Sequence, residues 1–202
     1  AAINIDQFNI LNALTSEVPS LSCGISDTIA NISPAGTKSA GFTAAVGKLA
    51  SVGVTINGTN PTITEINSVA SATTGSINGE LSNTKTELAS LATDGSDFII
   101  ITVASGTMTV TEVATLENKT SRTTLDLSAA GATDSLSNMI NAGAATATDN
   151  LTTTLTADPN LAVVVSNITD ATAANIADFK KLVELVQAGS GTVTSTITST
   201  LA

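Results

Sequence analysis

The sequence contains no histidine, tryptophan or tyrosine, and phenylalanine, present four times, is its only aromatic residue. Without histidine, a Ser-His-Asp triad, a Cys-His pair and an ordinary zinc site are excluded. Cys23 is the only cysteine, which rules out an intrachain disulfide and leaves a small buried apolar residue as the simplest role for it. These absences predict a protein that is not an enzyme.

Basic residues and long apolar runs are also scarce. Seven Lys and Arg stand against 17 Asp and Glu, which gives a formal net charge of −10. Nucleic-acid backbones and anionic membrane surfaces need clustered positive charge, so neither is expected as a partner. No apolar run approaches the roughly 20 residues of a membrane-spanning helix, and we expect no membrane insertion. No Walker loop or G-x-G-x-x-G motif supports nucleotide binding.

Threonine and small apolar residues are abundant instead. The chain has 35 threonines, whose branched Cβ favours strands, and a hydrophobic content of 42%, which argues against global disorder. With so few aromatic residues, the core must consist of Ala, Val, Ile and Leu, which suits closely stacked layers. We therefore expect a folded chain of repeat-like or cell-surface composition.

Four segments share one helix-start pattern, in which a cap residue is followed three positions later by an acid or amide side chain. The caps are Asn4, Thr62, Thr109 and Asn175. Apolar residues follow each cap at positions one, four and seven, which is the spacing of one helical face. These residues are Ile5, Phe8 and Leu11; Ile63, Ile66 and Val69; Val110, Val113 and Leu116; and Ile176, Phe179 and Leu182. Internal repetition of one amphipathic helix is the economical explanation.

Short β-branched runs predict strands after and between these helices. Residues 98–103 form an apolar run that we expect to be a strand covered on both faces. Further strands are expected at 20–26, 76–82, 122–128 and 191–201. Second helices are expected at 37–52, 85–92 and 133–142, and second strands begin at 54, 98 and 150. Residues 161–165 fit either a buried strand or a helical turn.

The alternation of helices and strands predicts the fold class. Apart from Asn57-Gly58, adjacent strands lack the tight turns of hairpins, so parallel pairing through helical crossovers is favoured. We expect an α/β fold of diverged helix-strand repeats with mainly parallel strands, similar to a solenoid. The repeat array spans residues 1–202, with approximate units 1–60, 61–107, 108–173 and 174–202. The alternative is a single α+β domain.

Asp94 and Asp97 are the candidate metal ligands. Together with the carbonyl groups around Gly95, they supply the hard oxygen atoms that calcium prefers. The competing interpretation is capping and turn chemistry between a helix and a strand. Neither an EF-hand loop nor a G-G-x-G-x-D nonapeptide is present, so calcium is the only cofactor considered and no catalytic residue is proposed.

Two long segments carry a resemblance to a known group of proteins. They are TVTEVATLENKTSRTTLDLSAAGATDSLSNMI, which begins at Thr109, and DATAANIADFKKLVELVQAGSGTVTSTIT, which begins at Asp170. Both resemble Thr/Ala/Asn-rich repeats of very large bacterial surface proteins, S-layer-like or adhesin-like, especially cyanobacterial ones. The resemblance implies an extracellular or cell-surface location and a structural or adhesive role. Phage virion proteins share this composition.

The functional expectation is end-to-end self-assembly into a filament, sheet or surface layer. The chain opens at the Asn4 cap and closes on the uncharged segment 191–201, which has the composition of a strand edge left open for pairing. The alternatives are an adhesin, a glycan- or calcium-binding module, or a virion protein. A binding module needs aromatic anchors, and three of the four phenylalanines (Phe8, Phe42, Phe98 and Phe179) fall at positions expected in the core.

Overall fold

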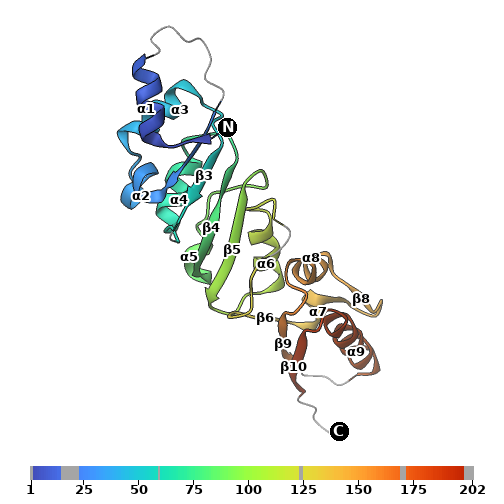
Figure 1. Ribbon diagram of the computed structural model, residues 1–202. Coiled ribbons are helices and arrows are strands. Elements are labelled where there is room, and N and C mark those ends of the chain that lie inside the picture. Colours follow the sequence, from blue (N-terminus) through green and yellow to red (C-terminus); the bar gives the residue numbers. More distant parts are fainter. Residues whose placement is uncertain (1, 15–22, 59, 123–124, 169–171, 198–202) are drawn as a thin grey trace. The chain divides into compact units, whose positions relative to one another are not determined.

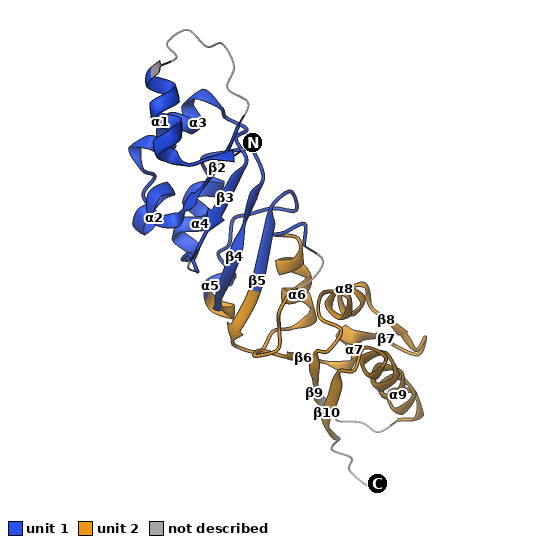
Figure 2. Ribbon diagram, viewed as in Figure 1, with its two compact units in different colours: residues 1–83, 87–101, 119–122 blue, residues 84–86, 102–118, 123–202 orange. Residues whose placement is uncertain are grey.

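The computed structural model describes residues 2–14, 23–58, 60–122, 125–168 and 172–197 (Figure 1). The chain divides into two compact units, coloured separately in Figure 2. Unit 1 comprises Ala1–Asn83, Glu87–Ile101 and Lys119–Arg122, and unit 2 comprises Thr84–Thr86, Thr102–Asn118 and Thr123–Ala202.

The first ten elements alternate between strands and short helices. They are β1 (Ala2–Ile3), α1 (Ile5–Leu14), β2 (Gly24–Thr28), α2 (Ile29–Ile32) with the 3-10 turn η1 (Pro34–Gly36), α3 (Ala40–Lys48), β3 (Val54–Asn57), α4 (Ile63–Ala70), β4 (Ile77–Thr84) and α5 (Lys85–Leu88). β5 (Phe98–Ser105) follows, and the boundary between the two units passes through it.

These strands form a five-stranded parallel sheet in the order β1-β2-β3-β4-β5, so strands that are consecutive in sequence are neighbours in space. The register aligns Ile3 with Ile25, Ile25 with Val54, and Val54 with Ile77. This row of apolar side chains lies on the covered face, where α1 to α4 pack in unit 1 (Figure 2). The expected α/β class with mainly parallel strands is therefore confirmed.

The opposite face of the sheet is open, which corrects one expectation. Burial alternates along β5: Ile99, Ile101 and Val103 are fully buried, whereas Phe98 and Ile100 are 46% and 39% exposed. Residues 98–103 form a strand as expected, but only one of its faces is covered. The run is apolar at almost every position, so its sequence did not indicate which face would be open.

Three of the four expected helix starts are confirmed. Thr62 and Thr109 each form a complete capping box with the Glu three residues later. Asn4 and Gln7 bond each other's backbone N–H groups in the same manner, at 2.7 and 3.0 Å. The apolar stripe is also confirmed in α4, where Ile63, Ile66 and Val69 are all buried.

The fourth expected start, at Asn175, is wrong. Helix α9 (Ala173–Ala188) begins three residues earlier, where the Thr172 hydroxyl accepts a hydrogen bond from the Asn175 backbone N–H. Thr172 is itself a good cap, and the two alanines that follow it favour helix. The buried stripe shifts accordingly to Asp178, Leu182 and Val186, and Ile176 is 57% exposed. α9 has 16 residues, and no helix in the described ranges meets the length and hydropathy of a membrane span.

The remaining elements belong mainly to unit 2. They are α6 (Val110–Glu117), β6 (Ala132–Asp134), α7 (Leu136–Met139), β7 (Ile140–Asn141), β8 (Thr146–Ala147), α8 (Asp149–Ala157), β9 (Ala162–Ile168), α9 and β10 (Thr192–Ile197). β10, β9 and β6 form a second parallel sheet in that order, and β7 pairs with β8 in an antiparallel ribbon. Of the two alternatives for residues 161–165, a buried strand or a helical turn, the structure therefore has the strand.

Several expectations in this region are wrong. The segment that begins at residue 150 is helix α8, not a strand, because Thr148 caps it and Leu151, Thr154 and Ala157 are buried on one side. The hydroxyls of Thr152, Thr154 and Thr156 each donate to the carbonyl four residues earlier, which satisfies them inside the helix.

The segments at 122–128 and 133–142 also differ from expectation. Residues 123 and 124 lie outside the described residues. The described part of 122–128 forms a single parallel bridge, from Asp126 to Thr102, in place of the expected strand. Leu125 and Leu127 are nevertheless buried, as the alternation predicted. Residues 133–142 divide into the end of β6, the one-turn helix α7 and β7, since Ser135 caps a new helix directly after the strand.

Candidate functional site on the open face of the sheet

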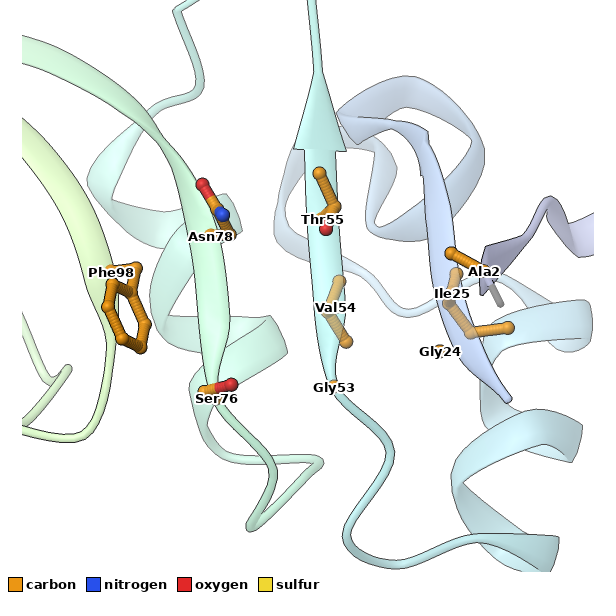
Figure 3. Close-up of a pocket in the computed structure, with 9 residues that line it drawn as sticks. All are labelled: Ala2, Gly24, Ile25, Gly53, Val54, Thr55, Ser76, Asn78 and Phe98. Carbon is orange, nitrogen blue, oxygen red and sulfur yellow. The ribbon is translucent and has the colours of Figure 1, made fainter. Parts of the chain in front are cut away.

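The open face of the unit 1 sheet contains a shallow groove with a volume of about 370 Å³. It crosses the strands near their starts, and Figure 3 shows its lining side chains. The lining residues are Ala2, Gly24, Ile25, Gly53, Val54, Thr55, Ser76, Asn78 and Phe98. They come from all five strands or from the residues directly before them, so the parallel register builds this groove.

Glycines form the floor of the groove. Gly24 pairs with Ala2 across the first two strands, and Gly53 lies directly before β3. A Cβ atom on Gly24 would approach the Gly53 carbonyl oxygen to 3.1 Å, which is closer than ordinary van der Waals contact. The missing side chains therefore leave a depression between Ala2 on one side and Phe98 on the other, which are labelled in Figure 3.

Phe98 forms one wall of the groove. Its ring is 46% exposed, and the Arg122 guanidinium carbon lies 5.9 Å from the ring centroid, within the range of a cation–π contact. The Arg122 Nε atom is buried and has no hydrogen-bond partner among the described residues, which fits a guanidinium group packed against the ring. A half-exposed aromatic ring held by a neighbour is a preformed contact surface.

The polar part of the lining consists of hydroxyl and amide groups. The side chains of Thr55, Ser76 and Asn78 face the groove (Figure 3), and none has a hydrogen-bond partner within the described part of the chain. The strand backbones below are already paired: Ile25 N–H donates to the Gly53 oxygen and Val54 N–H to the Ser76 oxygen, both at 2.9 Å. No described residue that lines the groove carries a charge, and the nearby Arg122 guanidinium packs against the Phe98 ring.

Asp94 and Asp97 lie elsewhere in unit 1, in the turn before β5. The Asp97 carboxylate is buried and accepts hydrogen bonds from Ile77 N–H at 2.7 Å and Asp94 N–H at 3.1 Å. Asp94 accepts from the Ser96 N–H and hydroxyl, which lower the pKa of the Asp94 carboxyl below its ordinary value. Both residues border a small cavity of about 50 Å³.

These contacts are the turn and capping chemistry that competed with calcium. Among the described residues, no three Cys, Asp or Glu side chains group closely enough to hold a metal ion. Calcium binding at Asp94 and Asp97 stays a prediction. Cys23 lies directly before β2, is half-buried and forms no disulfide in the described part of the chain.

Unit 2 offers a second candidate surface at the edge of its sheet. Within the described residues, β10 pairs with β9 on one side only. Residues Thr192–Ile197 include no proline and no charged residue, and the side chains of Thr192, Thr194 and Thr196 are exposed. Proteins commonly protect such an edge with charge, proline or a bulge, and β10 carries only a register irregularity between Ser195 and Ile197.

Comparison of the chain with protein-family models, with curated proteins and with solved structures gave no match.

Proposed function

We propose that this chain is a non-enzymatic structural module of an extracellular or cell-surface assembly, which associates with further copies of itself through an edge of its parallel sheets. The carrying observation is β10, an uncharged strand with one side unpaired among the described residues. An unpaired strand exposes backbone N–H and C=O groups that a strand of another chain can bond.

The order of the strands supports the same proposal. In β1 to β5, each strand lies beside the next in sequence, and helices connect them on one face. Solenoids share this feature, because each of their repeats contacts its sequence neighbours and a terminal repeat without a cap can receive another repeat. We therefore propose a solenoid-like architecture in which the next parallel strand comes from a second copy.

The β1 edge of a second copy is the partner that we propose for β10. β1 is a terminal strand of the five-stranded sheet of unit 1, whereas β10 is a terminal strand of the three-stranded sheet of unit 2, and Ala2 and Ile3 carry no side-chain charge. A contact between two different edges is heterologous, so it does not close on itself and produces a filament or layer. Since each chain carries a formal charge of −10, repulsion between copies opposes this contact, and added salt should promote it.

Light scattering and electron microscopy of the intact chain test the proposal. A double variant, Thr194→Lys and Thr196→Lys, places two charges on β10 at exposed positions. The matched control is Ala177→Lys, which adds the same side chain at an exposed position on α9 in the same unit.

We expect the wild type and the Ala177→Lys control to form filaments or layers, increasingly so with added salt, and the double variant to remain monomeric. Circular dichroism spectra should be the same for all three proteins. A wild type that stays monomeric at every protein and salt concentration would refute the proposal, as would assembly of the double variant at the level of the control.

A further inference from the structure

We propose that the groove on the open face of the unit 1 sheet binds a neutral saccharide, with Phe98 as the stacking platform. This inference does not rest on the proposed self-assembly, because the groove lies on the face of the sheet and the assembly contact uses strand edges; Ala2 of β1 is the residue that borders both surfaces. The volume of about 370 Å³ falls within the range of about 300–1,000 Å³ for small-ligand sites.

The exposed ring provides the apolar half of such a site. The face of an aromatic ring carries partial negative charge, so it attracts the weakly positive C–H groups that a pyranose presents on its flat side. Phe98 is held against Arg122 before any ligand arrives, which lowers the entropic cost of ordering the platform. Beyond Ser76 and Asn78 at the neighbouring strand, the side-chain-free floor at Gly24 and Gly53 leaves room for a further sugar ring to lie flat on the strands.

The hydroxyl and amide groups provide the polar half. Thr55, Ser76 and Asn78 come from β3 and β4 and from the residue before β4, and their side chains point into the groove without hydrogen bonds to described residues (Figure 3). Each hydroxyl both donates and accepts, and the amide of Asn78 does so through separate atoms. This set matches the hydroxyl rim of a sugar, which also donates and accepts at each position.

The chemistry of the groove disfavours other occupants. The described residues that line the groove carry no charge for an ionic ligand to pair with, and the nearby Arg122 guanidinium is already packed against the Phe98 ring. An extended peptide binds by adding a strand to a sheet edge, but the backbones of β2, β3 and β4 at the groove are already paired with each other. A neutral ligand with one apolar face and many hydroxyl groups is the class that remains.

Titration of the full chain with maltotriose, cellotriose and N-acetylchitotriose, followed by ¹H–¹⁵N NMR, tests the inference. We expect saturable binding of at least one of these with a Kd of about 1 mM or tighter, with the largest shifts at the amides of Gly24, Gly53 and Ser76. Phe98→Ala should weaken the binding at least about tenfold, since it removes the platform.

Ile100→Ala is the matched control, because Ile100 is 39% exposed on the same strand and face but does not line the groove. Its affinity should equal that of the wild type. If Phe98→Ala fails to fold, Phe98→Leu keeps an apolar side chain and removes only the ring, and it should show the same loss. The inference is overturned if none of the three sugars binds, if Ile100→Ala loses as much affinity as Phe98→Ala, or if only a sulfated trisaccharide binds.

Discussion

Replacing Asp97 with alanine tests whether its carboxylate connects the start of β4 to the turn before β5. The Asp97 side chain is 5% exposed, and one of its oxygens accepts the Ile77 N–H at 2.7 Å while the other accepts the Asp94 N–H at 3.1 Å. The carboxylate therefore anchors the first residue of β4 from the turn that precedes β5. In the alanine variant, the buried Ile77 N–H loses its acceptor.

The expected loss of unfolding free energy is about 2–4 kcal/mol. A hydrogen bond to a charged group contributes about 1.5–3 kcal/mol, and a buried donor left unsatisfied costs about 1–3 kcal/mol. The Asp94 N–H lies in a more exposed turn, where water replaces the lost acceptor, so its contribution is smaller. For a chain of this length, the loss corresponds to a melting temperature lower by roughly 5–15 °C.

Circular dichroism melting and hydrogen exchange at the Ile77 amide measure the effect. Asp97→Asn keeps an acceptor oxygen without the charge, so it should lie between the wild type and Asp97→Ala. Asp94→Ala is the control, because its side-chain contacts with Ser96 stay within one exposed turn, and it should change the melting temperature little. The Ile77 amide should exchange faster in Asp97→Ala than in Asp94→Ala.

The same proteins test calcium. If Asp97 were a calcium ligand, added CaCl₂ would raise the melting temperature of the wild type and leave Asp97→Ala unchanged. If the carboxylate serves only to accept the two backbone N–H groups, CaCl₂ will have no effect on either protein. An Asp97→Ala variant as stable as the wild type, with an unchanged exchange rate at Ile77, would contradict the reasoning.

Three further predictions concern other elements. Burial raises the pKa of the Glu117 carboxyl above its ordinary value of 4.5, so the stability linked to its neutral form is fully present below pH 4.5 and is lost as the pH rises through the folded-state pKa. Glu117→Gln should therefore gain stability relative to wild type as the pH rises above 4.5 in urea titrations. Thr172→Ala should cost about 1 kcal/mol by removing the cap of α9, and equal helix content and stability would argue against that cap. Gly47 lies inside α3, where an added Cβ atom meets open space, so Gly47→Ala should stabilise the protein by about 0.5–1 kcal/mol. A Cβ atom on Gly75 would collide with the Val52 carbonyl oxygen, so Gly75→Ala should destabilise the protein by about 1–3 kcal/mol in the same urea titrations.

Local helix signals could be predicted from the sequence because they depend on residues within one turn. The capping boxes at Thr62 and Thr109 involve a hydroxyl and a carboxylate three residues apart, so no distant contact is needed to form them. The same reasoning gave the wrong start at Asn175, because Thr172, which two alanines follow, caps the same helix three residues earlier. The segment after Thr148 failed for a related reason: threonine favours strands in general, but in α8 its hydroxyls bond the helix backbone.

The candidate groove could not be predicted from the sequence. Its residues are separated along the chain by up to 96 positions, from Ala2 to Phe98 (98 − 2), and they meet only through the parallel register. The sequence suggested a buried Phe98 because the three residues that follow it are apolar, and no polar residue in 98–101 indicated the open face. Nothing in the sequence around Gly24 and Gly53 indicated that these two glycines would lie side by side in one groove.

The sequence by itself determined that the core is mainly aliphatic, although Phe8, Phe42, Met108 and Met139 are also buried in it. It also determined the exclusion of histidine chemistry, three of the helix starts and the preference for parallel strands with helical crossovers. These follow from residue types and from spacings of a few positions. Only the tertiary structure decided which face of the sheet stays open, where β10 lies in its sheet, and how Asp97 is used. Each of these depends on strand pairing between residues about 20 or more positions apart, and a strand is compatible with either face until its partners are in place.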